Sequence, residues 1–146
     1  MSLPPLPPEA VVIGAAAPDW RAAVQRAGDA LVDSGAARPG YAGEMIRMIE
    51  EHGPYVVIAP GLALAHARPG PDVLADGLAI VTLAEPVNFG HPHNDPVNVV
   101  LGLAIATADE HLAAVAALAN VFNDSSAIID LAAATTADEV LRIMGA

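Results

Sequence analysis

The histidine and the arginine at positions 66 and 68 are a pair of side chains that could do chemistry together. Residues 61–69 read GLALAHARP, so His66 closes a run of small apolar residues and Arg68 follows two positions later. A neutral imidazole can attack phosphorus, and the planar guanidinium group of an arginine can hold the oxygens of a phosphate. The pattern suggests phosphoryl chemistry at a strand end, and spacing alone leaves a purely structural histidine equally open.

A second histidine, His111, stands in the first turn of a predicted helix. The preceding pattern from Thr107 to Glu110, Thr-Ala-Asp-Glu, is typical of a capping box at a helix start. Unpaired backbone N–H groups and the positive end of the helix dipole make such a turn suitable for a phosphate. Helical geometry alone leaves an exposed residue without a chemical role as the alternative for His111.

The segment His91-Pro-His93-Asn-Asp95 raises a different interpretation, a metal site. Two histidines and a carboxylate at this spacing can bind zinc or a related ion, and a further ligand such as His66 would have to come from elsewhere in the fold. The flanking prolines favour a surface loop instead. The remaining histidine, His52, precedes Gly-Pro at a predicted helix end, where we interpret it as a cap.

The composition excludes several other kinds of chemistry. The 146 residues include no cysteine, which excludes disulfides and a cysteine nucleophile, and no lysine, which excludes Schiff-base chemistry. A formal net charge of -11 argues against binding to nucleic acid or to anionic membranes. No apolar run approaches the ~18–20 residues of a membrane span, and the N-terminus lacks the features of a signal peptide, so we expect a cytoplasmic protein.

Hydrophobic patterns predict a single α/β domain in which a mixed β-sheet is flanked by helices on both faces. Apolar runs of strand length occupy residues 11–14, 55–59, 62–65, 77–84 and 97–106. Helical periodicity and capping signals occupy residues 20–33, 41–51, 107–122, 125–134 and 136–144. We expect the Pro-rich residues 1–9 to form a disordered tail, so that the domain spans residues 10–146.

Four segments in this order carry a resemblance to a known family: GPYVVIAPGLALAHARP, EPVNFGHPHNDPVNVVLGLA, DEHLAAVAAL and SSAIIDLAAATTADEVL. Together they resemble the mannitol/fructose-type enzyme IIA (EIIA, type 2) of the bacterial phosphoenolpyruvate-dependent sugar phosphotransferase system (PTS). The HARP and HNDPV motifs are most similar to its ascorbate-type branch. The resemblance extends from about residue 11 to residue 144 and implies the mannitol-type EIIA fold, in agreement with the mixed sheet predicted above.

The resemblance implies a phosphocarrier. In that family the histidine that ends the strand is phosphorylated, which falls on His66, and a second active-site histidine falls on His111. Family members accept the phosphoryl group from the carrier protein HPr and pass it, in most branches, to a cysteine of an EIIB protein, which serves a membrane component, EIIC. The resemblance implies neither a cofactor nor a metal. Ascorbate or a related sugar or polyol is the expected transported compound, and a homodimer is left open.

The sequence departs from the family pattern at two places. Ala65 stands where the family usually has proline directly before the phosphorylated histidine. Mannitol-type members also carry an active-site arginine on the upstream helix, but the matching place is near Glu50, so Arg47 is not a secure equivalent. We therefore hypothesise that Arg68 holds the phosphate. A regulatory EIIA-like module, whose phosphorylation state controls a partner protein, is the second interpretation.

Overall fold

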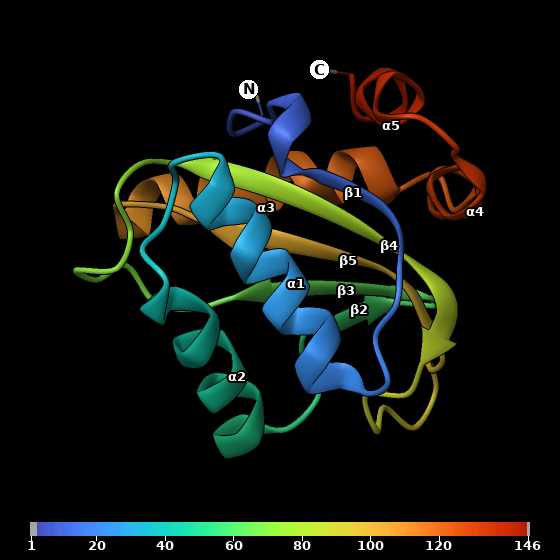
Figure 1. Cartoon of the computed structure of the whole chain (residues 1–146), viewed down its shortest axis with the longest axis horizontal. Coiled ribbons are helices and arrows are strands. Elements are labelled where there is room, and N and C mark those ends of the chain that lie inside the picture. The colour runs from blue at the N-terminus through green and yellow to red at the C-terminus, as the bar shows by residue number, and fades with distance from the viewer. Residues whose placement is uncertain (1–2, 146) are drawn as a thin grey trace.

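A five-stranded mixed β-sheet forms the centre of the computed structural model, which describes residues 3–145. The strands lie in the order β1-β4-β5-β3-β2 (Figure 1). β1 runs parallel to β4 and β3 runs parallel to β5, whereas the pairs β4–β5 and β2–β3 are antiparallel. The bounds are Val11–Ala15 for β1, Val57–Ala59 for β2, Leu62–His66 for β3, Gly77–Val87 for β4 and Val97–Ala104 for β5. The predicted mixed sheet is confirmed.

The strand ends differ from the predicted ones in a way that matters for His66. β3 is one residue longer than predicted and includes His66, because His66 still pairs with Leu103 of the parallel strand β5. β5 in turn ends at Ala104 rather than at residue 106. His66 is therefore the last paired residue of a central strand, and the chain leaves the sheet directly after it.

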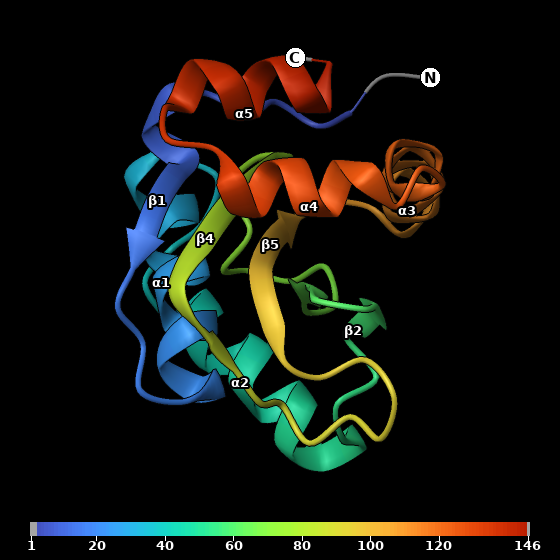
Figure 2. The same cartoon turned by 90° about the vertical axis from the view of Figure 1, so that its right-hand side faces the viewer.

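Helices cover both faces of the sheet, as predicted. α1 (Trp20–Asp33) packs on β4 and β5, and α2 (Gly40–His52) packs beside α1. On the opposite side lie α3 (Ala108–Phe122), α4 (Ser126–Ala133) and α5 (Ala137–Met144), with α4 crossing β4 and β5 in Figure 2. No single helix within residues 3–145 is long and apolar enough to cross a membrane. α3 and α4 reach the necessary length only together, and they meet at a bend of 87°.

Three helices begin with a side-chain cap, and the cap predicted at Thr107 is confirmed. The side chains of Asp19, Thr107 and Thr136 accept hydrogen bonds from the backbone N–H groups three residues later, at 2.9, 3.3 and 3.2 Å. Each bond satisfies a donor that the first turn of a helix otherwise leaves unpaired. The cap at Thr107 fixes the start of α3, and it therefore fixes the turn that carries His111.

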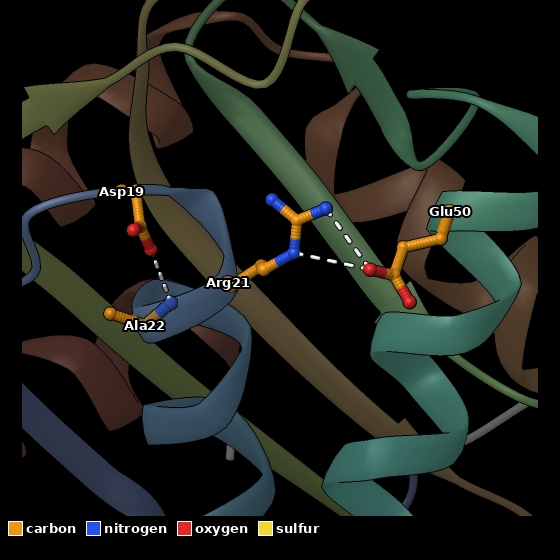
Figure 3. A network of polar contacts seen from close by, with 4 residues as sticks. All are labelled: Asp19, Arg21, Ala22 and Glu50. Atoms are coloured by element: carbon orange, nitrogen blue, oxygen red, sulfur yellow. Dashed lines mark hydrogen bonds and ion pairs between the residues drawn. The ribbon is translucent and has the colours of Figure 1, made fainter.

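Two contacts hold α2 against α1. Gly28 of α1 permits a close approach, because a β-carbon at this position would overlap the side chain of Ala42 in α2. Nearer the surface, the Nε and Nη2 atoms of Arg21 donate to one carboxylate oxygen of Glu50 at 3.2 and 3.0 Å (Figure 3). The close approach holds the first turn of α2, and the ion pair links α1 to the C-terminal half of α2, which forms one wall of the cavity described below.

The N-terminal segment differs from the expected disordered tail in the part that the structure describes, which begins at Leu3. Leu6 is only 8 % exposed, and the carbonyl oxygen of Pro5 accepts a hydrogen bond from the Leu78 N–H group at 3.0 Å. A 3-10 helix, η1 (Pro8–Ala10), then leads into β1. A proline cannot donate to a strand, but its carbonyl can accept, and this is how the Pro-rich segment is attached to β4.

Candidate active site

His66 presents a defined ring tautomer at the end of β3. Its Nδ1 atom lies 2.9 Å from the carbonyl oxygen of Leu64, two residues earlier in the same strand. A carbonyl oxygen can only accept a hydrogen bond, so Nδ1 must carry the proton. The opposite ring nitrogen, Nε2, then keeps a free lone pair. The half-buried His66 ring is therefore set up as a nucleophile at Nε2.

The structure brings His111 next to His66. The centroids of the two rings are 5.3 Å apart and their planes are inclined by 51°. Burial lowers the pKa of His111, and the nearby His66 lowers it further. The His111 ring is therefore neutral in the unmodified protein at neutral pH, and one of its nitrogens can donate a hydrogen bond to a group bound beside His66.

A surface cavity of about 610 Å³ contains both histidines and Arg68. Its walls come from the end of α2, the loop after α2, the end of β3 and the first turns of α3. The polar lining residues are His52, Tyr55, His66, Arg68 and His111, and the apolar ones are Met48, Ala67, Pro69, Ala108 and Leu112. The three site residues expected from the sequence thus share one cavity. The apolar wall around them suits contact with another protein surface.

Tyr55 and Arg68 complete the polar lining around His66. The Tyr55 ring stands perpendicular to the His66 ring, with centroids 5.7 Å apart. Burial raises the pKa of Tyr55, and the positive charge of Arg68, which lines the same cavity, acts in the opposite direction. Among residues 3–145 no carboxylate lies within 4.0 Å of the Arg68 side chain. Its guanidinium group is therefore available to an anion.

Arg47, the other candidate for holding phosphate, lies elsewhere. It pairs with Glu44 and Glu51 on the exposed side of α2 and does not line the cavity that contains His66. Arg47 lines an adjoining cavity of about 370 Å³, which Arg68 lines as well. His52, which we interpreted as a cap, does end α2, but it also lines the His66 cavity. The spacing of four residues between Met48 and His52 could have indicated that both lie on one helix face.

Sequence reasoning missed Tyr41, a buried residue of α2 that contacts the backbone beside His66. Tyr41 is 1% exposed. Its hydroxyl donates to the carbonyl oxygen of Leu103 at 2.7 Å and accepts from the Ala67 N–H group at 3.1 Å. Burial raises the pKa of Tyr41 to about 12, so the hydroxyl keeps its proton at neutral pH.

The segment with His91, His93 and Asp95 organises a loop and does not form the metal site considered above. The Asp95 carboxylate accepts hydrogen bonds from three backbone N–H groups, those of Phe89, Gly90 and His91, at 3.1, 2.7 and 3.0 Å. The His91 Nδ1 atom accepts from the N–H groups of His93 and Asn94. Within residues 3–145 no group of three or more histidine, aspartate or glutamate side chains is arranged to hold a metal ion. The metal interpretation of this segment therefore has no support.

The sequence and the fold are similar to those of sugar phosphotransferase components. The family described as "Phosphoenolpyruvate-dependent sugar phosphotransferase system, EIIA 2" matches residues 5–146. The ascorbate-specific PTS system EIIA component of Shigella boydii is 36% identical over 137 residues, which are 93% of this chain and 89% of that protein. The same component of Escherichia coli K12 is 35% identical over the same shares. A solved complex of enzyme IIA-mannitol with phosphorylated enzyme IIB-mannitol from Escherichia coli superimposes with a TM-score of 0.85 at 28% identity, covering 97% of each chain.

Proposed function

Because the chain belongs to the EIIA 2 family of the phosphoenolpyruvate-dependent sugar phosphotransferase system, we propose that it is a phosphocarrier whose acceptor atom is Nε2 of His66. The observation that carries the proposal is the hydrogen bond from His66 Nδ1 to the Leu64 carbonyl, which leaves the Nε2 lone pair free in a cavity shared with His111 and Arg68. The phosphoryl donor is the phosphohistidine of HPr, and the acceptor is a cysteine of an EIIB protein.

In the first step, the Nε2 lone pair of His66 attacks the phosphorus of the HPr phosphohistidine. A new N–P bond forms as the old one breaks, and the electron pair of the old bond returns to the HPr imidazole. The Leu64 carbonyl stabilises the positive charge that develops on the His66 ring through the Nδ1–H group. Arg68, His111 and the N-terminus of α3 stabilise the three phosphoryl oxygens during the transfer.

In the second step, a thiolate of EIIB attacks the phosphorus on His66. An S–P bond forms, the N–P bond breaks, and its electron pair returns to Nε2. The acceptor sulfur must come from a partner, because the sequence contains no cysteine. A relative supports the choice of partner, since the matching mannitol enzyme IIA is solved in a complex with phosphorylated enzyme IIB. The same cavity would serve both partners in turn.

The transported compound is ascorbate or a related sugar or polyol. Support comes from the curated relatives named as ascorbate-specific, which are 35 and 36% identical and match 93% of this chain. The carrier would work in the cytoplasm, where HPr and EIIB meet it, and EIIB would pass the group on to sugar that enters through a membrane EIIC. Uptake of labelled ascorbate in cells that lack the gene for this chain, compared with uptake of pentitols, would identify the compound.

A phosphorylation assay tests the proposal. The full chain is incubated with radiolabelled phosphoenolpyruvate, enzyme I and HPr, in parallel with His66→Ala and with His93→Ala, a matched histidine substitution in the exposed loop outside the cavity. We expect acid-labile label on the wild type and on His93→Ala, and none on His66→Ala. Label that persists on His66→Ala would contradict the assignment. Labelling of His66 without onward transfer to any EIIB cysteine would favour the regulatory interpretation.

A further inference from the structure

We infer that Tyr41 is a positioning residue for His66, because its hydroxyl ties the backbone directly after the nucleophile to the end of the neighbouring strand. The inference rests on the proposed role of His66 and adds a residue that does not line the His66 cavity. Tyr41 belongs to the first turn of α2, and its side chain extends through the core to the C-terminal ends of the parallel strands β3 and β5.

The two shorter hydrogen bonds of the Tyr41 hydroxyl join three elements at one point, and a longer contact of 3.4 Å reaches the carbonyl oxygen of Ala67. The oxygen accepts from the N–H group of Ala67, the residue after His66, at 3.1 Å. Its proton goes to the carbonyl oxygen of Leu103, the residue that pairs with His66 across the β3–β5 ladder, at 2.7 Å. The hydroxyl therefore links Ala67, the first residue after β3, to Leu103, the partner of His66 in β5.

The position explains why a polar group is needed in this part of the core. Ala67 is only 6% exposed, and it follows the last residue of β3, so its N–H group has no ladder partner. A buried backbone N–H group is almost always paired, since leaving it without a partner is costly. The Tyr41 hydroxyl supplies that partner. Because Tyr41 is only 1% exposed, a water molecule cannot easily take the place of its hydroxyl.

The backbone of His66 is thereby fixed on both sides. Before His66 the ladder with β5 holds the chain, and after His66 the Tyr41 hydroxyl holds it. With both neighbours fixed, the ring can keep its Nδ1 bond to Leu64 and its place 5.3 Å from His111. Phosphoryl transfer needs the attacking nitrogen in line with the bond that breaks, so a displacement of about 1 Å is enough to cost on the order of 100-fold in rate.

The decisive experiment compares Tyr41→Phe with a matched control, Thr82→Val, in the full chain. Thr82 is 2% exposed, and its hydroxyl also accepts from a backbone N–H group, that of Gly14 at 2.9 Å. This bond links β4 to β1, and Thr82 does not line the cavity. Initial rates of labelling are measured against the concentration of phosphorylated HPr. For Tyr41→Phe we expect kcat to fall about 10- to 100-fold with KM changed less than about twofold, and for Thr82→Val we expect both constants to be retained.

A structural readout separates this inference from the proposed function. In the wild type, 15N NMR should show His66 with its proton on Nδ1, and in Tyr41→Phe it should show a mixture of tautomers. This comparison needs no phosphoryl transfer, so it decides the role of Tyr41 even if the wild type takes no label. An unchanged tautomer together with an unchanged kcat in Tyr41→Phe would overturn the inference, as would an equal loss of kcat in Thr82→Val.

If Tyr41→Phe does not fold, the wild type itself supplies the test. Hydrogen exchange should then show the Ala67 amide protected at least about as strongly as the amides inside β3, because a buried hydroxyl holds it. Exchange of the Ala67 amide at the rate of an unstructured peptide would overturn the inference.

Discussion

The rings of His66 and His111 lie with their centroids 5.3 Å apart, although one residue ends β3 and the other stands in the first turn of α3. The pKa of His111 is lowered mainly by burial and to a smaller extent by the nearby His66. A phosphoryl group on His66 would reverse this environment, because it brings about 1.5 to 2 negative charges to the same place. The pair can thus respond to phosphorylation through the protonation of His111.

We predict that phosphorylation of His66 raises the pKa of His111. An anion at this distance favours the imidazolium form, which then pairs with the phosphoryl oxygens. NMR titration of the His111 ring protons before and after phosphorylation measures the change. Before phosphorylation the pKa should lie below about 6.5, the ordinary value for histidine. An identical pKa in both states would show that the phosphoryl group does not lie beside His111.

The same lowered pKa predicts how His111 contributes to stability. Between the lowered pKa and about 6.5 the unfolded chain binds more protons than the folded one, so the free energy of unfolding rises with pH in this window. The contribution is fully present above the window and is lost as pH falls through it. Urea unfolding at about pH 5 and about pH 8 should show a smaller acid loss for His111→Gln than for the wild type. Equal losses would contradict the prediction.

We predict that the phosphohistidine is the Nε2 isomer. The Nδ1 atom of His66 is occupied as a donor to the Leu64 carbonyl at 2.9 Å, and only the other nitrogen has a lone pair for attack. The 31P and 15N NMR spectra of the phosphorylated chain distinguish the two isomers. Phosphorus bonded to Nδ1 would mean that this hydrogen bond breaks before transfer.

Strand and helix positions could be predicted because their signals are local. The caps at Thr107 and Thr136 and the alternation of apolar runs depend on residues within a few positions of each other, and the helices begin and end within one residue of the predicted bounds. The same signals placed His66 at a strand end and His111 at a helix start. The family resemblance added that these two positions belong to one site, which spacing alone left open.

Other parts of the site could not be predicted because they depend on tertiary contacts. Tyr41 lies in α2 and reaches Ala67 and Leu103 only after the helix packs on the sheet, and no periodic pattern records that contact. The metal interpretation of the loop around Asp95 fails for a related reason. Its residue types match a metal ligand set, but a sequence does not show whether a carboxylate accepts from a metal or from backbone N–H groups.

We predict that Asp95→Ala lowers the free energy of unfolding by about 2 to 3 kcal/mol. The substitution leaves three backbone N–H groups without their charged acceptor, and hydrogen bonds to charged groups are worth about 1.5–3 kcal/mol. Urea unfolding measures the loss. A chelator should leave the unfolding curve of the wild type unchanged, because these groups stabilise a loop rather than bind a metal. A chelator effect as large as that of Asp95→Ala would restore the metal interpretation.

We predict that Arg68→Ala slows phosphorylation of His66 by about 10- to 100-fold, because removing a donor that stabilises transition-state charge typically costs about that much or more. The rate of Arg68→Lys should lie between those of the wild type and of Arg68→Ala, since lysine keeps the positive charge but lacks the planar guanidinium group. The matched control is Arg47→Ala, which removes an arginine that pairs with Glu44 and Glu51 and does not line the cavity of His66. Single-turnover rates with phosphorylated HPr measure all three. A normal rate for Arg68→Ala, or an equal loss for Arg47→Ala, would exclude Arg68 as the phosphate-binding residue.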